Sequence, residues 1–134
     1  MAVTTSKCGY SKHLAKRSMP DAKAAVVEAL KQEGFGVLTE IDIKDTFKKK
    51  LNVEFRDYLI LGACNPAFAH QALSNELEVG LLLPCNVCLW SEGDGVTVAM
   101  VRPDAMFTLI DDADVGPVAV QVDEKLRRAL DAVA

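Results

Sequence analysis

Apolar positions recur along the chain with two different periods, which predicts a mixture of helices and strands. A spacing of three to four residues, typical of an amphipathic helix, follows Ser18-Met19-Pro20 and follows Pro117. Ser18 can cap the first of these helices, Pro20 suits its first turn, and Gly34 stands where a helix ends. We therefore expect two long helices, one ending near Gly34 and one running from Pro117 to about Val133.

Other segments alternate with the period of two that is typical of a strand with one solvated face. The clearest lies between Phe35 and Ile43, where every second residue is Phe, Val, Thr or Ile. A continuous apolar run ends at Gly62 and predicts a central strand, and Glu92-Gly93-Asp94-Gly95 predicts a hairpin turn. The expected strands are residues 10–18, 35–43, 58–61, 85–90 and 96–101.

Shorter helices complete the prediction. Asp45 is the expected cap of a basic helix over residues 46–51, Asn65-Pro66 opens a further helix, and Pro103-Asp104 starts one that reaches about residue 110. Strands and helices are mixed, and the clearest connection is a hairpin. The predicted fold is therefore α+β, an antiparallel sheet covered on one face by helices, in the order β-α-β-β-α-β-β-α with short extra helices.

Composition and charge narrow the function classes. The 134 residues predict a single domain over 1–134, and a net charge of −4 argues against nucleic acid as a partner. We expect no membrane association, since apolar runs are short, and no signal peptide, since the N-terminus is polar. Four cysteines in a chain of this length do not indicate a disulfide framework, so we expect a reduced, cytoplasmic protein.

The dipeptide Cys-Asn occurs twice, in GACNPAFAH (62–70) and in LLPCNVCLW (82–90). Cys64 precedes a predicted helix N-terminus, where the helix dipole lowers the pKa of a thiol. Cys85 starts a predicted strand. If that strand and the one ending near Gly62 are antiparallel neighbours, Cys64 and Cys85 share one rim of the sheet with Asn65 and Asn86. These four residues are the predicted site.

Two other interpretations of the cysteines are an inert structural role, which stays open, and a metal site, which loses support. Cys64 and Cys85 are also suited to be small, inert, buried residues. Cys85 and Cys88 form C-x-x-C, but residues three apart on a strand point to opposite faces, and the chain has no second such motif. We therefore predict neither a metal site nor a cofactor. His70 lies nearly two helical turns from Cys64 and is not expected to assist it.

Three stretches carry a resemblance to a known family. GFGVLTEIDI (34–43), YLILGACNPAFAH (58–70) and VGLLLPCNV (79–87) resemble the DUF302 family of small bacterial and archaeal proteins, over residues 8 to 132. The resemblance implies an α+β, TBP-like arrangement, a homodimer, and motif residues at Cys64, Asn65, Cys85 and Asn86. It implies no settled biochemical function. Cys88 departs from the family pattern.

Three functional hypotheses follow. The first is a small dimeric thiol protein that binds a small molecule or carries sulfur, with Cys64 reactive, Cys85 resolving or supporting, and the two asparagines as polar contacts. The second is a non-enzymatic binding or regulatory module with structural cysteines. The third is metal or haem binding. A hydrolase has least support, because no nucleophile, base and orienting group can be placed together. Trp90 or Phe107, if exposed, would serve the dimer seam.

Overall fold

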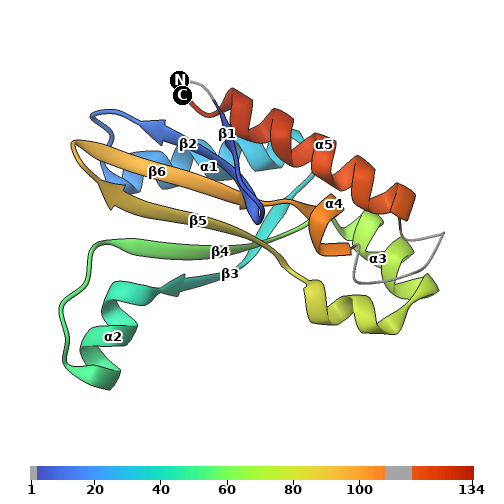
Figure 1. The fold of residues 1–134 in the computed structure, drawn as a ribbon, viewed down its shortest axis with the longest axis horizontal. Helices are drawn as coiled ribbons and strands as arrows, with labels where there is room; N and C mark the ends of the chain where they lie inside the picture. Colours follow the sequence, from blue (N-terminus) through green and yellow to red (C-terminus); the bar gives the residue numbers. More distant parts are fainter. Residues whose placement is uncertain (1–2, 108–115) are drawn as a thin grey trace.

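The computed structural model describes residues 3–107 and 116–134, in which six strands form an antiparallel sheet with helices packed on it (Figure 1). The spatial order is β1-β2-β6-β5-β4-β3, and every neighbouring pair is antiparallel. This confirms the predicted α+β class. The strands are β1 (Thr4–Thr5), β2 (Gly9–Leu14), β3 (Gly36–Asp42), β4 (Tyr58–Cys64), β5 (Cys85–Glu92) and β6 (Gly95–Val101).

Two long helices, α1 (Met19–Gln32) and α5 (Gly116–Ala132), pack against each other and cover one face of the sheet (Figure 1). As predicted, α1 begins at a Ser18 cap, whose side chain accepts a hydrogen bond from the Asp21 N–H, and ends before Gly34. Gly34 has a φ of 84°, which favours glycine. The remaining helices are α2 (Ile43–Leu51), α3 (Pro66–Asn75), the 3₁₀ helix η1 (Leu77–Leu82) and α4 (Pro103–Met106).

Alternation along the strands assigns each side chain to a face of the sheet. Leu61, Val87 and Leu89 are fully buried beneath the helices, while the alternate residues Asn86 and Cys88 lie on the open face. The core therefore lies between the sheet and the α1–α5 layer. Its largest fully buried side chains are Leu30, Leu61, Leu89, Met100, Leu126 and Leu130.

Strand β4 is longer than the sequence predicts, because Gly62 does not end it. The strand continues to Cys64, and Gly62 pairs with Asn86 in β5. A Cβ atom at Gly62 would lie 2.2 Å from the Thr39 Oγ1 atom and 2.8 Å from the Pro84 Cγ atom. The glycine therefore permits close packing across the strands instead of terminating one.

Strand β3 differs from its prediction in phase. The register between β3 and β4 shifts between Val37 and Thr39, so the alternation reverses at that point. Val37 packs on the core, but Ile41 is 47% exposed, and Glu40 pairs with Leu61 and forms an ion pair with Lys23 of α1. The predicted inward set was wrong beyond Val37, because a single-strand pattern does not reveal the shift.

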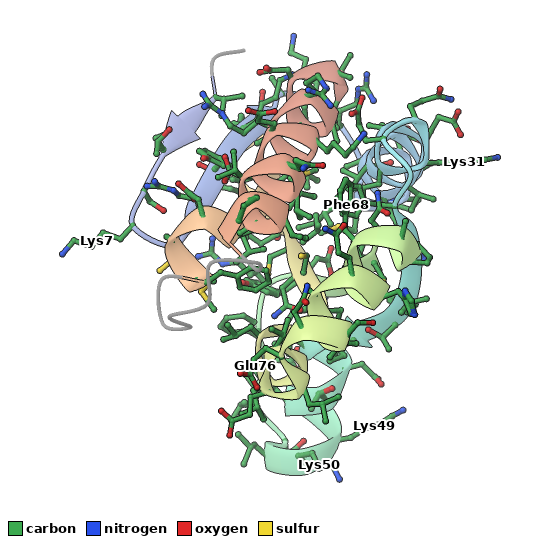
Figure 2. The ribbon with its side chains drawn as sticks, turned by 90° about the vertical axis from the view of Figure 1, so that its right-hand side faces the viewer. Lys7, Lys31, Lys49, Lys50, Phe68 and Glu76 are labelled. Atoms are coloured by element: carbon green, nitrogen blue, oxygen red, sulfur yellow. The ribbon has the colours of Figure 1, made fainter. Side chains whose placement is uncertain are left out.

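Helix α2 begins three residues earlier than predicted. Its cap is Asp42, whose carboxylate accepts from the Asp45 N–H, and Asp45 instead pairs with Lys49 in the first turns. The helix buries none of its side chains and projects from the sheet (Figure 1), and Lys49 and Lys50 lie near its outer end (Figure 2). The tail of the helix predicted after Pro103 falls outside the described residues. Within those residues, none of the helices combines the length and apolar character that a membrane span requires.

Candidate functional site

Strands β4 and β5 are hydrogen-bonded antiparallel neighbours, which is the condition under which the sequence places Cys64 and Cys85 on one rim. Ala63 at the end of β4 lies opposite Cys85 at the start of β5, and Cys64 is the next residue along β4. The two cysteines of the repeated dipeptide therefore share one rim of the sheet. The same rim receives the N-terminus of α3, which begins directly after Asn65.

Cys64 and Cys85 line a common cavity beneath the helix layer. Its walls are apolar and come from β4, from Phe68 and Ala72 of α3, from Leu83, from Phe107 after α4, and from Val118 and Val122 of α5. Figure 2 shows Phe68 in the region between α3 and α5. The space available to a water-sized molecule is about 20 Å³. A single water needs roughly 10–15 Å³, so the cavity holds one small group rather than a metabolite.

The environment of Cys64 opposes the predicted activation of its thiol. The residue is half-buried, and burial among apolar side chains raises its pKa above the ordinary value. The expectation that the α3 N-terminus lowers this pKa is therefore wrong: desolvation disfavours the thiolate in the apolar cavity. Cys64 is a predominantly neutral thiol near pH 7.

Cys85 is buried and even less acidic. Burial, with a smaller contribution from the nearby Cys64, raises the pKa of Cys85 to about 11. This contribution shows that the thiols of Cys64 and Cys85 lie near each other. All four cysteines of the chain are free thiols in the structure. The cavity therefore presents a partly accessible thiol, Cys64, beside a fully enclosed one.

Asn65 occupies the N-cap position of α3 but makes no side-chain capping hydrogen bond. Its amide Nδ2 instead donates to the Glu33 carbonyl oxygen at 3.4 Å, which ties α3 to the end of α1. The residue also lines the thiol cavity. It thus joins the site as predicted, although its hydrogen bond serves the packing of two helices.

Asn86 does not join the other three predicted residues. It is the residue after Cys85 on a strand, so it lies on the opposite, open face and is exposed. There it lines a separate groove with Cys8 and Cys88. The predicted separation of Cys85 from Cys88 is confirmed: Cys85 is on the helix-covered face, and Cys88 pairs with Ile60 on the open face. Among the described residues there is no group of three or more His, Cys, Asp or Glu side chains suited to a metal ion.

Sequence reasoning missed the apolar wall of the cavity. Phe107, which was considered for a dimer seam, is only 7% exposed and faces the thiols with Val118 and Val122. Its position in the chain gave no sign of this, because the contact joins residues that lie far apart in the sequence. The apolar spacing of three to four residues after Pro117, which includes Val118 and Val122, was the available signal.

The fold agrees with that of a known protein, and the sequence matches a known family. A family model described as a domain of unknown function, DUF302, matches residues 10–133. The crystal structure of an uncharacterized conserved DUF302 protein from Bacillus stearothermophilus superposes with a TM-score of 0.85. The two sequences are 28% identical, and the match covers 94% of this chain and 98% of the other. No curated protein matches the chain. The chain therefore belongs to the DUF302 family.

Proposed function

We propose that the protein is a small thiol protein that holds one sulfur atom, or a comparably small soft group, on Cys64 in the cavity shared with Cys85. The observation that carries the proposal is the meeting of two thiols from adjacent strands in one apolar cavity. The free space in this cavity, about 20 Å³, is close to the space that one small atom or one water molecule needs. A space of this size among the described side chains does not admit larger ligands.

The raised pKa of Cys64 gives such a site selectivity. A neutral thiol reacts slowly with general electrophiles, because the thiolate is the nucleophile. A small reagent that enters the cavity meets the thiol at close range, whereas a bulky one is excluded. The apolar walls then shield the group carried on Cys64 from water. Such a protein would work in a reducing compartment such as the cytoplasm, where its four free thiols would persist.

Loading is a transfer of sulfane sulfur. The thiolate of Cys64 attacks the outer sulfur of a low-molecular-weight persulfide, R–S–SH. The S–S bond of the persulfide breaks, its electron pair leaves with R–S⁻, and that thiolate takes the proton that Cys64 released. The products are a Cys64 persulfide and R–SH, so no external oxidant is needed. Cys85 stands beside the new S–S bond as the supporting or resolving thiol.

The experiment is mass spectrometry of the native protein after treatment with inorganic polysulfide. We expect a gain of one sulfur atom on Cys64 that dithiothreitol removes, and no gain at that position in Cys64→Ser. Cys8→Ser and Cys88→Ser are matched controls, because those cysteines line a groove on the other face, and both variants should load normally. Sulfur found only on the exposed Cys8, or on all thiols equally, would refute the proposal.

A binding module with structural cysteines is the second candidate. It is favoured by one observation: burial raises the pKa of both cavity thiols, which suits small apolar side chains. This candidate predicts that the Cys64→Ala, Cys85→Ala double variant loses some stability, because two buried sulfur atoms are removed, but folds and keeps any ligand of the wild-type protein. The sulfur-carrier proposal predicts that the double variant no longer takes up sulfur in the cavity.

We also propose, from the family resemblance, that the chain forms a homodimer. Apolar side chains that a second copy could cover are exposed on η1, where Leu77 and Leu81 are each 83% exposed, and on and beyond α2, at Leu51 and Phe55. Sedimentation equilibrium tests the proposal directly. A single species of monomer mass at micromolar concentration would overturn it.

A further inference from the structure

The open face of the sheet, opposite α1 and α5, has an apolar and uncharged centre. In Figure 1 the helix α1 lies behind the strands of this face. One cross-strand row on it consists of Ile41, Ile60, Cys88, Ala99 and Ser11, each paired with the next. An antiparallel sheet that leaves one face to water normally places polar residues there. Four of these five side chains are apolar, so the row has the composition of a covered face.

The adjacent row contains an aromatic ridge. This row consists of Tyr58, Trp90, Thr97 and His13, again paired across the strands. The Tyr58 and Trp90 rings stack with 5.6 Å between their centroids, and the exposed ring of Phe55 lies 6.3 Å from that of Tyr58. These three rings form the aromatic ridge. Trp90, which the sequence suggested for a dimer seam, is partly exposed here, and aromatic residues are enriched in the cores of protein interfaces.

A hollow lies on the same open face, over β2, β6 and β5. It holds about 210 Å³ of space, and its lining includes the small residues Gly9, Ser11, Ala99 and Cys88. The ridge projects from the face and the hollow recedes into it, so one copy of the face carries both members of a complementary pair. Two copies related by a twofold axis parallel to the face can place each ridge over the hollow of the other.

The face is also large enough for a specific contact. A third row, which continues it toward the thiol rim, consists of Thr39, Gly62, Asn86, Val101 and Gly9. With strands about 4.8 Å apart and residues of one face about 7 Å apart along each strand, three rows on the strands from β2 to β3 cover roughly 500 Å². Two copies face to face then bury about 1,000 Å², the area at which specific interfaces begin. None of the three rows contains Lys, Arg, Asp or Glu, so the contact leaves no such charge without a partner at its centre.

We propose that the open face is the interface between two copies of this chain, with the aromatic ridge of each copy seated over the hollow of the other. The inference rests on the homodimer proposed above and assigns its surface, which the family resemblance does not. The two sheets pack face to face, about 10 Å apart. Cys88, in the middle of the central row, is covered by the partner, whereas the cavity of Cys64 and Cys85 lies on the far side of each sheet.

The test places a charge in the hollow. Ala99→Lys fills part of it and brings an ammonium group into the contact twice, once from each copy. Sedimentation velocity at nanomolar to high micromolar concentrations should show a dimer dissociation constant raised by about a hundredfold or more, because a buried charge without a partner is costly. Ala99 is partly exposed in a single copy, so the monomer should keep its fold, which circular dichroism checks. Ile60→Lys, at another partly exposed position of the same row, is the second variant in case Ala99→Lys does not fold.

A matched control and a second readout accompany this measurement. Leu81→Lys introduces the same charge at an exposed apolar residue of η1, outside the three rows, and should leave the dissociation constant unchanged. Alkylation of wild-type Cys88 by iodoacetamide, followed by mass spectrometry, should slow by about tenfold or more as the protein concentration rises through the dissociation constant, since only the monomer exposes this thiol. In Ala99→Lys the rate should not depend on concentration over the same range.

The outcomes separate this surface from the homodimer and from the sulfur-carrier function. A dimer that both open-face variants leave intact and Leu81→Lys dissociates would overturn the open face and assign the interface to η1. A wild-type protein that is monomeric at every concentration would overturn the surface and the homodimer together, and a small molecule found on it by native mass spectrometry would then be the occupant of the face. Sulfur uptake by Cys64 should persist in monomeric Ala99→Lys, because the cavity lies on the other face. Absence of that uptake in a wild-type dimer would remove the sulfur function and leave the interface in place.

Discussion

At the scale of single residues, the cysteines of this chain differ in how deeply their thiols are buried. Cys85 is enclosed on the helix-covered face, whereas Cys8 in the same chain is exposed. The thiol next to Cys85 in space, Cys64, is intermediate. The three therefore form a graded series within one molecule, and their reactivities can be compared without any change of protein.

The first prediction concerns the stability contributed by the Cys85 thiol. Its pKa rises from 9.0 to about 11 on folding, so the fold favours the neutral thiol. The contribution is fully present below about pH 9, and it is lost as pH rises through the folded pKa of about 11. The stability difference between wild type and Cys85→Ala should shrink by about 2–3 kcal/mol over that interval. Urea denaturation at closely spaced pH values measures it, and a constant difference would contradict the burial of the thiol.

The second prediction uses two glycines on neighbouring strands as a matched pair. Gly62→Ala places a Cβ against Thr39 Oγ1 and Pro84 and should cost about 1–3 kcal/mol. Gly36→Ala meets nothing within 4 Å and should be neutral or slightly stabilising. Chemical denaturation of both variants checks the difference. Thr39→Ala should recover part of the Gly62→Ala loss. Equal stabilities for the two glycine variants would show that Gly62 is not packed this closely against Thr39 of β3 and Pro84.

At the scale of elements, the structure shows which helices and strands can be predicted from local sequence signals alone. Helix α1 follows from its own residues, because Ser18, Pro20 and Gly34 each satisfy a local backbone requirement. The hairpin between β5 and β6 follows from Glu92-Gly93-Asp94-Gly95 for the same reason. The phase of β3 and the length of β4 cannot be predicted from their own residues. They depend on a register shift between two strands and on the close approach of Gly62 to Pro84.

Some features of the candidate site can likewise be predicted from the sequence, and others cannot. The two strands that carry Cys64 and Cys85 could be predicted, and the adjacency of the cysteines followed only on the condition that these strands pair, which the structure shows. The raised pKa of Cys64 could not, because it depends on walls supplied by α3, α5 and Phe107. Asn86 was grouped with the site because of the repeated dipeptide, although strand alternation alone places it on the opposite face.

The third prediction tests what Asn65 does between α1 and α3. If its side chain acted as a helix cap, Asn65→Asp would be tolerated, because both residues cap well. Its Nδ2 instead donates to the Glu33 carbonyl, and an aspartate has no such donor. Asn65→Asp should therefore cost about 1 kcal/mol, as much as Asn65→Ala. Thermal denaturation of the three proteins decides the matter: an aspartate variant as stable as wild type would assign Asn65 to capping.

At the scale of the whole molecule, an early strand holds the end of the last helix on the helix-covered face of the sheet. Strand β2 packs under the last turns of α5 (Figure 1). The connection is made by Lys12, a buried lysine whose Nζ donates to the carbonyl oxygens of Leu130, Asp131 and Val133. Leu130 and Asp131 belong to the last turn of α5, whose carbonyls lack partners within the helix, and Val133 follows the helix directly. The Leu130 carbonyl also accepts from the Val133 N–H.

The last prediction follows from that arrangement. Lys12→Met keeps the length and apolar stem of the side chain but leaves the carbonyls at the end of α5 without their charged donor. Hydrogen bonds to charged groups contribute about 1.5–3 kcal/mol, so the free energy of unfolding should fall by an amount in this range. Lys7→Met, at an exposed position (Figure 2), is the matched control and should change stability little. Hydrogen exchange locates the effect: amides of residues 130–133 should lose protection first, while those of α1 keep theirs. Uniform loss of protection would mean that Lys12 supports the core as a whole, and that the chain end is held by the apolar contacts of Leu130 and Val133 instead.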